Sequence, residues 1–513
     1  MARSRSPHYC APVRSALRLS FLCLLALVAV VGFTAATPAK HKVPAKKKKP
    51  AVATTTAAAT TTAAEPALPP ANDSQWTEFG HDDQSTKEVV SAGITNANVS
   101  SLRQHWRVTL AGTIVAQPLY YNGVVYAASE GGDVVAINAQ TGKQLWKRTT
   151  SVVSVPACSQ SPNFGISSTP VIDTVRNRIY VAAANGGINA YDLTTGGEQP
   201  GFPFSVVRSS AMEYAWGGLR LYGSNILVGV ASHCDEPNSS GGYATGKLAA
   251  YNVVNQPGAL TAVFQPVPGA GHLGGVWGYS GATITADGQS IYTAVGNAIG
   301  TDPSCKCQHD NWGYGESIVQ LTPALTVAGS NDPGVPTSGD DDWGAAPALF
   351  TPAGCQPLAV ASNKDGLLYV YDQGSLNSGP IWDLGIGDGQ SPLLDSPAWS
   401  PFTKMFYVSG ARMPFDRSQP RTGEGIVAVK VSAGCKFSVA WTAQTGDGAQ
   451  SPPIVVGNIV FASGGTSGIV ALDALTGKEL WSAPTSGPTI ASPSEAGGLL
   501  FAPDGSSVVA WGP

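Results

Sequence analysis

The sequence has few charged residues and no cysteine spacing typical of a haem or zinc site. Only 12% of its 513 residues are Asp, Glu, Lys or Arg, whereas 60 are Gly and 38 are Pro. No CxxC or CxxCH motif occurs, so we expect no covalent haem. The Cys305–Cys307 pair has no matching Cys or His pair at zinc spacing. The composition instead indicates short strands joined by many tight turns around a large buried core.

Negative charge is almost absent from the beginning of the chain. Ten of the 30 basic residues precede residue 50, and Glu65 is the single acid before residue 66. The rest of the chain therefore carries 20 basic and 33 acidic residues. Because affinity for nucleic acid comes mostly from cationic contacts to phosphates, we expect no nucleic-acid partner.

The N-terminus has the pattern of an export signal. Four Arg precede an uncharged apolar run, residues 19–36, which ends in small residues. This run also reaches the lower length limit of a membrane-spanning helix, so residues 1–36 are predicted to be a signal peptide or a membrane anchor. Residues 37–71 are rich in Lys, Ala, Thr and Pro and predict a disordered linker. We expect a folded domain over 72–513, exported to the periplasm or the outside and either free or tethered.

Cysteine usage agrees with export. An even number of cysteines in an exported chain favours disulfides, although 15 connectivities remain open. The six that follow the apolar run are Cys158, Cys234, Cys305, Cys307, Cys355 and Cys435.

An internal repeat organises the rest of the chain. Residues 118–146 and 453–481 each take 28 steps from Pro to Trp, with an aromatic residue eight positions after the Pro and a Thr-Gly-Lys turn before the Trp. Each unit contains four apolar, β-branched stretches separated by Gly- and Asn-rich turns, which predicts four antiparallel strands. Four such strands form one propeller blade, and the Trp is expected to wedge between blades.

Weaker copies fill the space between these two units. They lie at 168–197, 219–252, 280–297, 346–372 (closed by Trp382), 396–430 (closed by Trp441) and 492–511. The last copy supplies only three strands, and the missing one is available around Trp106. We therefore predict an all-β, eight-bladed β-propeller of four-stranded antiparallel blades, closed by pairing the N-terminal strand with the last blade. Seven blades is the alternative, because the fourth and sixth copies are irregular.

These repeats resemble those of the pyrroloquinoline-quinone (PQQ) repeat propellers. That family includes quinoprotein alcohol dehydrogenases, polyvinyl-alcohol-dehydrogenase-like proteins and non-catalytic outer-membrane assembly factors. The resemblance covers residues 76–513 and is carried by the AxNxxTGKxxW and AxDxxTGKxxW turns, and by the opening WTEFGHDDQST. The segments GVASHCDEPN and DDDWGAAP resemble the polyvinyl-alcohol-dehydrogenase-like branch best.

The resemblance implies a site that holds PQQ and calcium. Trp277 matches the residue that stacks on the quinone, and Lys364 matches the basic residue that faces its oxygens. Asn297 matches a calcium ligand. A second ligand should come from the enlarged loop of the third blade, which offers Asp235 and Glu236 and for which Glu236 is the candidate.

The acidic cluster before Trp343 matches the position of the family's catalytic carboxylate. Asp342 is the first choice for the proton-accepting residue and a third calcium ligand, and Asp340 is the second choice. Each match has an alternative reading as core packing, a turn or a solvated loop.

Two departures from the family weigh against catalysis. No two cysteines are adjacent, although Cys158 falls near the family's adjacent pair, and Phe164 replaces the Arg that grips the quinone carboxylates. Two hypotheses remain. One is a PQQ- and calcium-dependent dehydrogenase that oxidises an alcohol or sugar and passes electrons to a separate acceptor. The other is a scaffold that binds a protein or a cell-envelope polymer.

Overall fold

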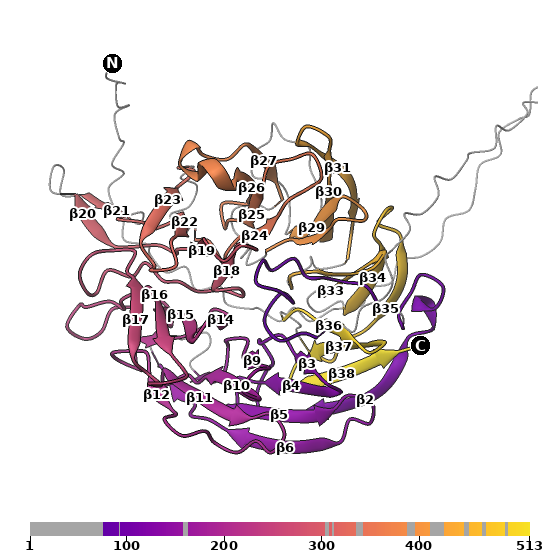
Figure 1. The fold of residues 1–513 in the computed structure, drawn as a ribbon, viewed down its shortest axis with the longest axis horizontal. Helices are drawn as coiled ribbons and strands as arrows, with labels where there is room; N and C mark the ends of the chain where they lie inside the picture. The colour runs from indigo at the N-terminus through magenta and orange to yellow at the C-terminus, as the bar shows by residue number, and fades with distance from the viewer. Residues whose placement is uncertain are drawn as a thin grey trace, which may run out of the picture. The chain divides into compact units, whose positions relative to one another are not determined.

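The computed structural model describes most of the chain from residue 75 onward (Figure 1). The described residues are 75–91, 93–156, 158, 163–302, 307–309, 312–334, 342–386, 396–410, 425–445, 451–463, 468–487 and 491–513. The predicted signal or anchor (1–36) and the predicted linker (37–71) lie outside them, as do Asp340 and Cys305. Within the described part, no helix has the length and apolarity needed to cross a bilayer.

The first four blades follow one another along the chain, and each contains four antiparallel strands. Blade 1 has β3 (Leu119–Tyr121), β4 (Val124–Ala128), β5 (Asp133–Asn138) and β6 (Gln144–Thr149); blade 2 has β9 (Val171–Asp173), β10 (Arg178–Ala182), β11 (Gly187–Asp192) and β12 (Phe204–Ser205). Blade 3 has β14 (Arg220–Tyr222), β15 (Asn225–Ser232), β16 (Lys247–Asn252) and β17 (Leu260–Phe264); blade 4 has β18 (Ala282–Ile284), β19 (Ile291–Ala294), β22 (Ile318–Leu321) and β23 (Val327–Asn331).

The last four blades complete the ring. Blade 5 has β24 (Ala348–Phe350), β25 (Leu358–Ser362), β26 (Leu367–Asp372) and β27 (Trp382–Gly385); blade 6 has β28 (Ala398–Ser400), β29 (Met405–Gly410), β30 (Gly425–Ser432) and β31 (Lys436–Ala443). Blade 7 has β32 (Ile454–Val456), β33 (Ile459–Ser463), β34 (Ile469–Asp473) and β35 (Glu479–Ala483); blade 8 has β36 (Ser494–Ala496), β37 (Leu499–Asp504), β38 (Ser507–Gly512) and β2 (Arg103–Thr109).

The other elements are short and lie outside the four main strands of each blade. They are β1 (Glu88–Val89), β7 (Val153–Ser154), β8 (Asn163–Phe164), β13 (Glu213–Tyr214), β20 (Gly300–Asp302), β21 (Cys307–His309) and the 3₁₀ turns η1 (Val99–Ser101) and η2 (Gln373–Ser378).

The ring closes between its first and last strands, as the repeat predicts. β2 pairs antiparallel with β38, from Arg103 opposite Gly512 to Thr109 opposite Ser507. This pairing covers the edge that the three-stranded last repeat would otherwise leave exposed. The eight-bladed prediction is confirmed, and the seven-bladed alternative is wrong.

In the units that carry it, the repeated Trp joins one blade to the next. The Trp106 indole N–H donates to the carbonyl of Ala139 in blade 1 at 2.7 Å, and that of Trp146 donates to Leu193 in blade 2 at 2.9 Å. Trp441 makes the equivalent bond into blade 7. The prediction that the Trp wedges between blades and finds a backbone partner is therefore confirmed.

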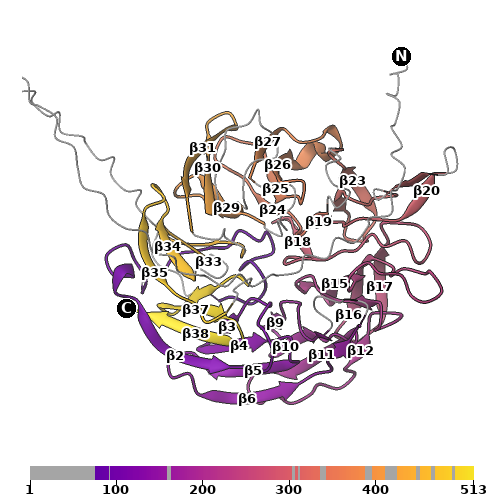
Figure 2. The ribbon, with the colours of Figure 1, turned by 180° about the vertical axis from the view of Figure 1, so that it is seen from behind.

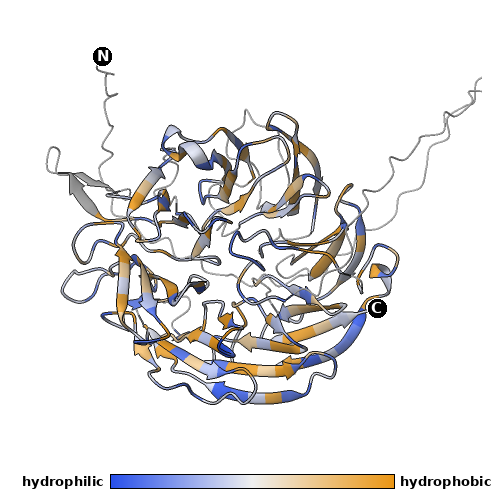
Figure 3. Cartoon of the chain, in the orientation of Figure 1, coloured by the Kyte–Doolittle hydropathy of each residue, from blue (hydrophilic) through white to orange (hydrophobic). Residues whose placement is uncertain are grey.

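The Thr-Gly turn is fixed by this same contact. Gly142 has a φ of +69°, and a Cβ atom there would lie 2.6 Å from Cγ of Trp106. Gly477 shows the same arrangement against Trp441. Glycine is required both by the left-handed backbone and by the indole that packs on it. The apolar residues lie mainly along the strands of the blades, where they form the core between neighbouring blades (Figure 3).

The segment Trp76–Val89, called the axial segment below, runs through the centre of the ring (Figures 1 and 2). Its carbonyls accept hydrogen bonds from backbone amides of the innermost strands in six blades. The donors are Tyr120, Ile172, Ile284, Leu349, Trp399 and Val455. In blade 3, the Arg220 side chain donates to two of its carbonyls. In blade 8, the carbonyl of Glu495 accepts from the Trp76 indole. The axial segment thus ties all eight blades together.

Candidate functional site

A cavity of about 180 Å³ gathers residues from blades 3, 4 and 5. They lie shortly before the innermost strand of a blade or at and after the end of its second strand, so they come from distant parts of the sequence. The lining residues are Trp216, Ala231, Ser232, His233, Cys234, Asp235, Gly275, Trp277, Gly296, Asn297, Asp342 and Lys364. Four residues predicted from the sequence, Trp277, Asn297, Asp342 and Lys364, therefore meet at one place.

Two indoles form an aromatic wall of the cavity. Trp277 is half-buried, and its ring centroid lies 4.9 Å from that of Trp216, with the planes tilted by 45°. The Lys364 ammonium lies 4.9 Å from the centroid of the Trp277 ring, in cation–π contact. The wall therefore combines an aromatic face with a positive charge.

Asp342 is the most enclosed charged group of the cavity, with 4% of its surface exposed. One carboxylate oxygen accepts from the Lys364 ammonium at 2.8 Å, and the other accepts from the backbone N–H of Asn297. The backbone N–H of Lys364 also donates to the Asp342 carbonyl at 3.1 Å. These charge-assisted bonds hold the carboxylate in a fixed orientation.

Glycines allow the walls of the cavity to approach one another. A Cβ atom at Gly296 would lie 2.6 Å from Asp342 Oδ1 and 2.9 Å from Trp277 Nε1. Gly278 has a φ of +81°, and a Cβ atom there would collide with the carbonyl of Gly344. The residues beside Trp277 and Asn297 are therefore small because blades 4 and 5 meet there.

Asn297 links two carboxylates. With its amide nitrogen turned toward them, it donates to Asp342 Oδ1 and to Asp235 Oδ2, each at 3.2 Å. In the opposite rotamer the amide oxygen occupies that position, and three oxygen-bearing side chains face one point. The second arrangement is the one that a bound cation would select.

The loop of blade 3 supplies Asp235 to this set. Glu236, the sequence candidate, is exposed and does not line the cavity. Asp235, which the same loop offered, does line it. Asp340, the second choice for the proton-accepting carboxylate, lies outside the described residues.

His233 lines the cavity and packs against two aromatic rings. Its ring centroid is 4.4 Å from those of Phe164 and Tyr214. Burial lowers the pKa of His233 below 6.5, and its Nε2 lies 3.1 Å from the carbonyl of Ser210. Nε2 therefore carries the proton and donates to Ser210. Phe164 is part of this apolar packing.

These side chains fit a hard cation and a planar anion. Two carboxylates and one amide supply oxygen donors, the ligands that calcium prefers. Within the described residues, no group of three His, Cys, Asp or Glu side chains could hold a metal, so a cation here requires the Asn297 amide. The Trp277 face and the Lys364 ammonium suit an aromatic ring that carries oxygens.

Two family models match parts of the chain. The β-propeller domain of glucose, ethanol and alcohol dehydrogenases matches residues 76–208. The outer membrane protein assembly factor BamB matches residues 423–511.

Similar known proteins likewise include alcohol dehydrogenases and BamB. The quinohemoprotein alcohol dehydrogenase ADH IIB of Pseudomonas putida is 27% identical over 189 residues, which cover 34% of this chain and 24% of that protein. The chain thus matches about a quarter of the length of this relative. A solved quinohemoprotein alcohol dehydrogenase from Pseudomonas putida HK5 superposes with a TM-score of 0.66 at 16% identity, covering 86% of this chain and 80% of that one. BamB from Moraxella catarrhalis gives a TM-score of 0.54 at 14% identity, covering 80% and 100%.

At 16% and 14% identity, the two solved structures show a similarity of fold alone. The finer resemblance to the polyvinyl-alcohol-dehydrogenase-like branch stays a prediction. The repeat, the eight-bladed ring and the two matched models agree with one another, and together they support a PQQ-repeat, quinoprotein alcohol dehydrogenase-like β-propeller.

Proposed function

We propose that the protein is a PQQ-dependent dehydrogenase that oxidises the hydroxyl group of an alcohol or sugar. The observation that carries this proposal is the meeting of Trp277, Asn297, Asp342 and Lys364 in one cavity, although they come from blades 4 and 5. Residues that served only packing, turns or solvation would have no reason to gather around one space.

Asp235, Asn297 and Asp342 hold the cation, with calcium as the first choice. A hard cation with oxygen ligands polarises a carbonyl oxygen placed beside it. Asp235 and Asp342 supply the negative charge that such a cation requires. Asn297 would hold the cation through its amide oxygen, since its nitrogen would otherwise face the positive charge.

Trp277 and Lys364 bind and orient the cofactor. The bound quinone would supply the two-electron acceptor of the reaction. Trp277 offers a flat apolar surface on which an aromatic ring stacks. Lys364 places its ammonium over the same indole, where it would stabilise negative charge on the oxygens of a bound quinone.

Asp342 accepts the proton of the substrate hydroxyl. Its carboxylate faces the cavity and is aligned by Lys364 and by the backbone N–H of Asn297. A carboxylate held in this way acts as a general base without needing to reorient.

The N-terminal pattern supports a place outside the cytoplasm. Residues 1–36 have the composition of an export signal or anchor, and the two described disulfides suit an oxidising compartment. The sequence contains no CxxCH motif, so the electrons pass to a separate acceptor.

Reconstitution of the full chain with PQQ and Ca²⁺ tests this function. A dye-linked dehydrogenase assay on primary alcohols and sugars should show turnover that requires both additions. Asp342→Asn should lower kcat by about 100-fold or more, because the variant loses the proton-accepting carboxylate. Asp383→Asn, which changes an exposed carboxylate on β27, should leave kcat unchanged. Turnover by Asp342→Asn at the unaltered rate would overturn the role of Asp342.

A scaffold function is the second candidate. Phe164 stands where the family's dehydrogenases carry an Arg, and residues 423–511 match the BamB model. A protein that keeps the ring without the cofactor would use its loops to bind another protein or an envelope polymer. Failure of the reconstituted chain to bind PQQ at micromolar concentration would favour this candidate.

A further inference from the structure

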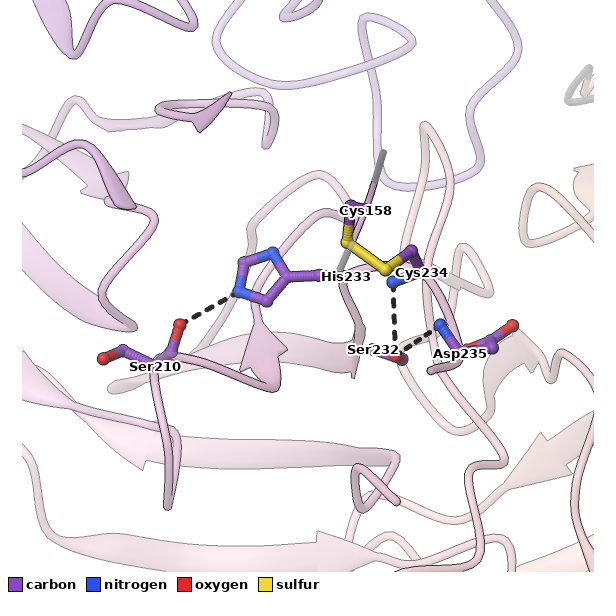
Figure 4. The surroundings of a disulfide bond; sticks show 6 residues. All are labelled: Cys158, Ser210, Ser232, His233, Cys234 and Asp235. Atoms are coloured by element: carbon purple, nitrogen blue, oxygen red, sulfur yellow. Dashed lines mark hydrogen bonds between the residues drawn. A yellow bond between two sulfur atoms is a disulfide. The ribbon is translucent and has the colours of Figure 1, made fainter. Parts of the chain in front are cut away.

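Cys234, one end of the Cys158–Cys234 disulfide, lines the cavity, and Figure 4 shows this disulfide with Asp235 next to it. It joins two segments that lie 76 residues apart in the sequence, with a Cα–Cα distance of 5.7 Å. Cys234 and Asp235 follow Ser232, the last residue of β15. The disulfide is therefore covalently next to the carboxylate that faces Asn297.

The two ends of the disulfide differ in burial. Cys158 is 6% exposed and belongs to an apolar cluster that includes Phe164 and Tyr214. Cys234 is exposed, as is Asp235. The buried end is fixed by packing, whereas the other end lies on the surface loop of blade 3. The disulfide thus anchors the loop to the core.

The anchored loop holds Asp235 in a defined backbone conformation. Its φ is +56°, a left-handed conformation that Asp tolerates better than most residues other than glycine. Its backbone N–H donates to Ser232 Oγ at 2.8 Å, as that of Cys234 does at 3.3 Å. The next strand of the blade, β16, begins only at Lys247. A conformation of this kind persists where the surrounding structure enforces it.

We propose that the Cys158–Cys234 disulfide positions Asp235 against Asn297, so that cation binding in the cavity depends on the disulfide being oxidised. This inference rests on the proposed function, because it takes Asp235, Asn297 and Asp342 as the cation site. Loss of a group that orients a metal ligand lowers metal affinity on the order of 10- to 100-fold. Cleavage of the disulfide should have an effect of that size.

Binding of Tb³⁺ alone to the full chain tests the inference without any turnover. Tb³⁺ replaces Ca²⁺ at oxygen sites, and indoles close to the site sensitise its luminescence, as Trp277 and Trp216 would. The chain should bind Tb³⁺, with Ca²⁺ as competitor. The Cys158→Ser/Cys234→Ser variant should bind it 10- to 100-fold more weakly.

The second disulfide provides the matched control. Cys355→Ser/Cys435→Ser removes a disulfide between blades 5 and 6 that does not line the cavity, and its Tb³⁺ affinity should stay within about twofold of the original. Asp235→Ala should weaken binding in the original chain and add little to the Cys158→Ser/Cys234→Ser variant, since both changes remove the same ligand.

Reduction of the folded chain covers the case in which the serine variant fails to fold. Dithiothreitol supplies two electrons and two protons, the S–S bond opens to two thiols, and the reductant closes to its cyclic disulfide. In the Cys355→Ser/Cys435→Ser background, reduction should release Tb³⁺ while the circular dichroism of the blades persists.

Two results contradict the inference, and they are distinguishable. Equal Tb³⁺ affinity with and without the Cys158–Cys234 disulfide overturns the positioning role and leaves the proposed function intact. Absence of Tb³⁺ binding by the oxidised, unaltered chain overturns the cation site, and the proposed function with it.

Discussion

Glu495 gives the sharpest stability prediction, because it is a carboxyl enclosed in the ring. It lies on β36, is 1% exposed, and contacts the chain just after the axial segment. Its Oε1 accepts from the Ser91 hydroxyl at 2.7 Å and from the Gly498 amide at 3.2 Å. Burial, which disfavours the charged form, raises the pKa of Glu495 from 4.5 to about 7, against the smaller opposing effect of these hydrogen bonds.

The raised pKa makes stability depend on pH in a defined sense. The folded chain binds the Glu495 proton more tightly than the unfolded chain does, so the contribution is fully present below about pH 4.5 and is lost as pH rises toward and through about 7. Each pKa unit corresponds to about 1.4 kcal/mol, so the whole shift is worth ~3 kcal/mol. Burial also raises the pKa values of Glu78 and Glu88 to about 7, so these two groups also lower the stability of the folded chain as pH rises.

Glu495→Gln removes the charge while retaining an oxygen for both hydrogen bonds. At about pH 8 the variant should be more stable than the original chain by up to ~3 kcal/mol, and at about pH 4 the difference should nearly vanish. Urea unfolding followed by tryptophan fluorescence at both pH values measures this. Glu479→Gln, on the exposed side of β35, should show no such pH-dependent gain. A Glu495→Gln variant that is less stable at pH 8, or equally shifted at both pH values, would refute the reasoning.

Two other predictions concern the turns and the cavity. Gly142→Ala should lower the free energy of unfolding by about 2–4 kcal/mol, because it adds a collision with the Trp106 indole to a left-handed backbone. Gly123→Ala, with φ +81° but open space around it, should lower it by about 1 kcal/mol. Equal losses of the two variants in urea unfolding would refute the indole contact. The His233 imidazole should titrate below 6.5 in NMR spectra and carry its proton on Nε2 when neutral, and a midpoint at or above 6.5 would contradict its enclosure.

Much of the fold could be predicted because each blade repeats the same physical requirements. The turn of blade 1 needs Asn138, whose side chain accepts from the amide of Thr141, and Gly142, which packs on Trp106. Blade 4 was harder to recognise. It inserts β20 and β21 between its second and third strands, which breaks the repeat spacing.

The candidate site was partly visible in the sequence for a different reason, because Trp277 and Asp342 were matched through the resemblance to the PQQ-repeat propellers. In the structure, each lies next to a glycine or a tryptophan-glycine pair where neighbouring blades approach closely. Asp235 could not be separated from Glu236, because the choice depends on a left-handed residue and on a disulfide pairing that the sequence left open.

Trp216 was missed although a signal for it exists. A Trp-Gly pair precedes the innermost strand in blades 3, 4 and 5, at Trp216, Trp277 and Trp343. The pattern alone does not identify a cavity, since Trp343 is fully buried and donates to the carbonyl of Glu316. Only the packing of neighbouring blades distinguishes the two uses.

Equilibrium titration of the full chain with PQQ tests the central claim most directly. In the presence of Ca²⁺, PQQ should quench the tryptophan fluorescence saturably at micromolar concentration, with one quinone bound per chain. Quenching should weaken strongly when Ca²⁺ is removed and should disappear in Trp277→Ala. Absence of saturable binding, or binding that is unchanged in Trp277→Ala and without Ca²⁺, would contradict a quinone site in this cavity.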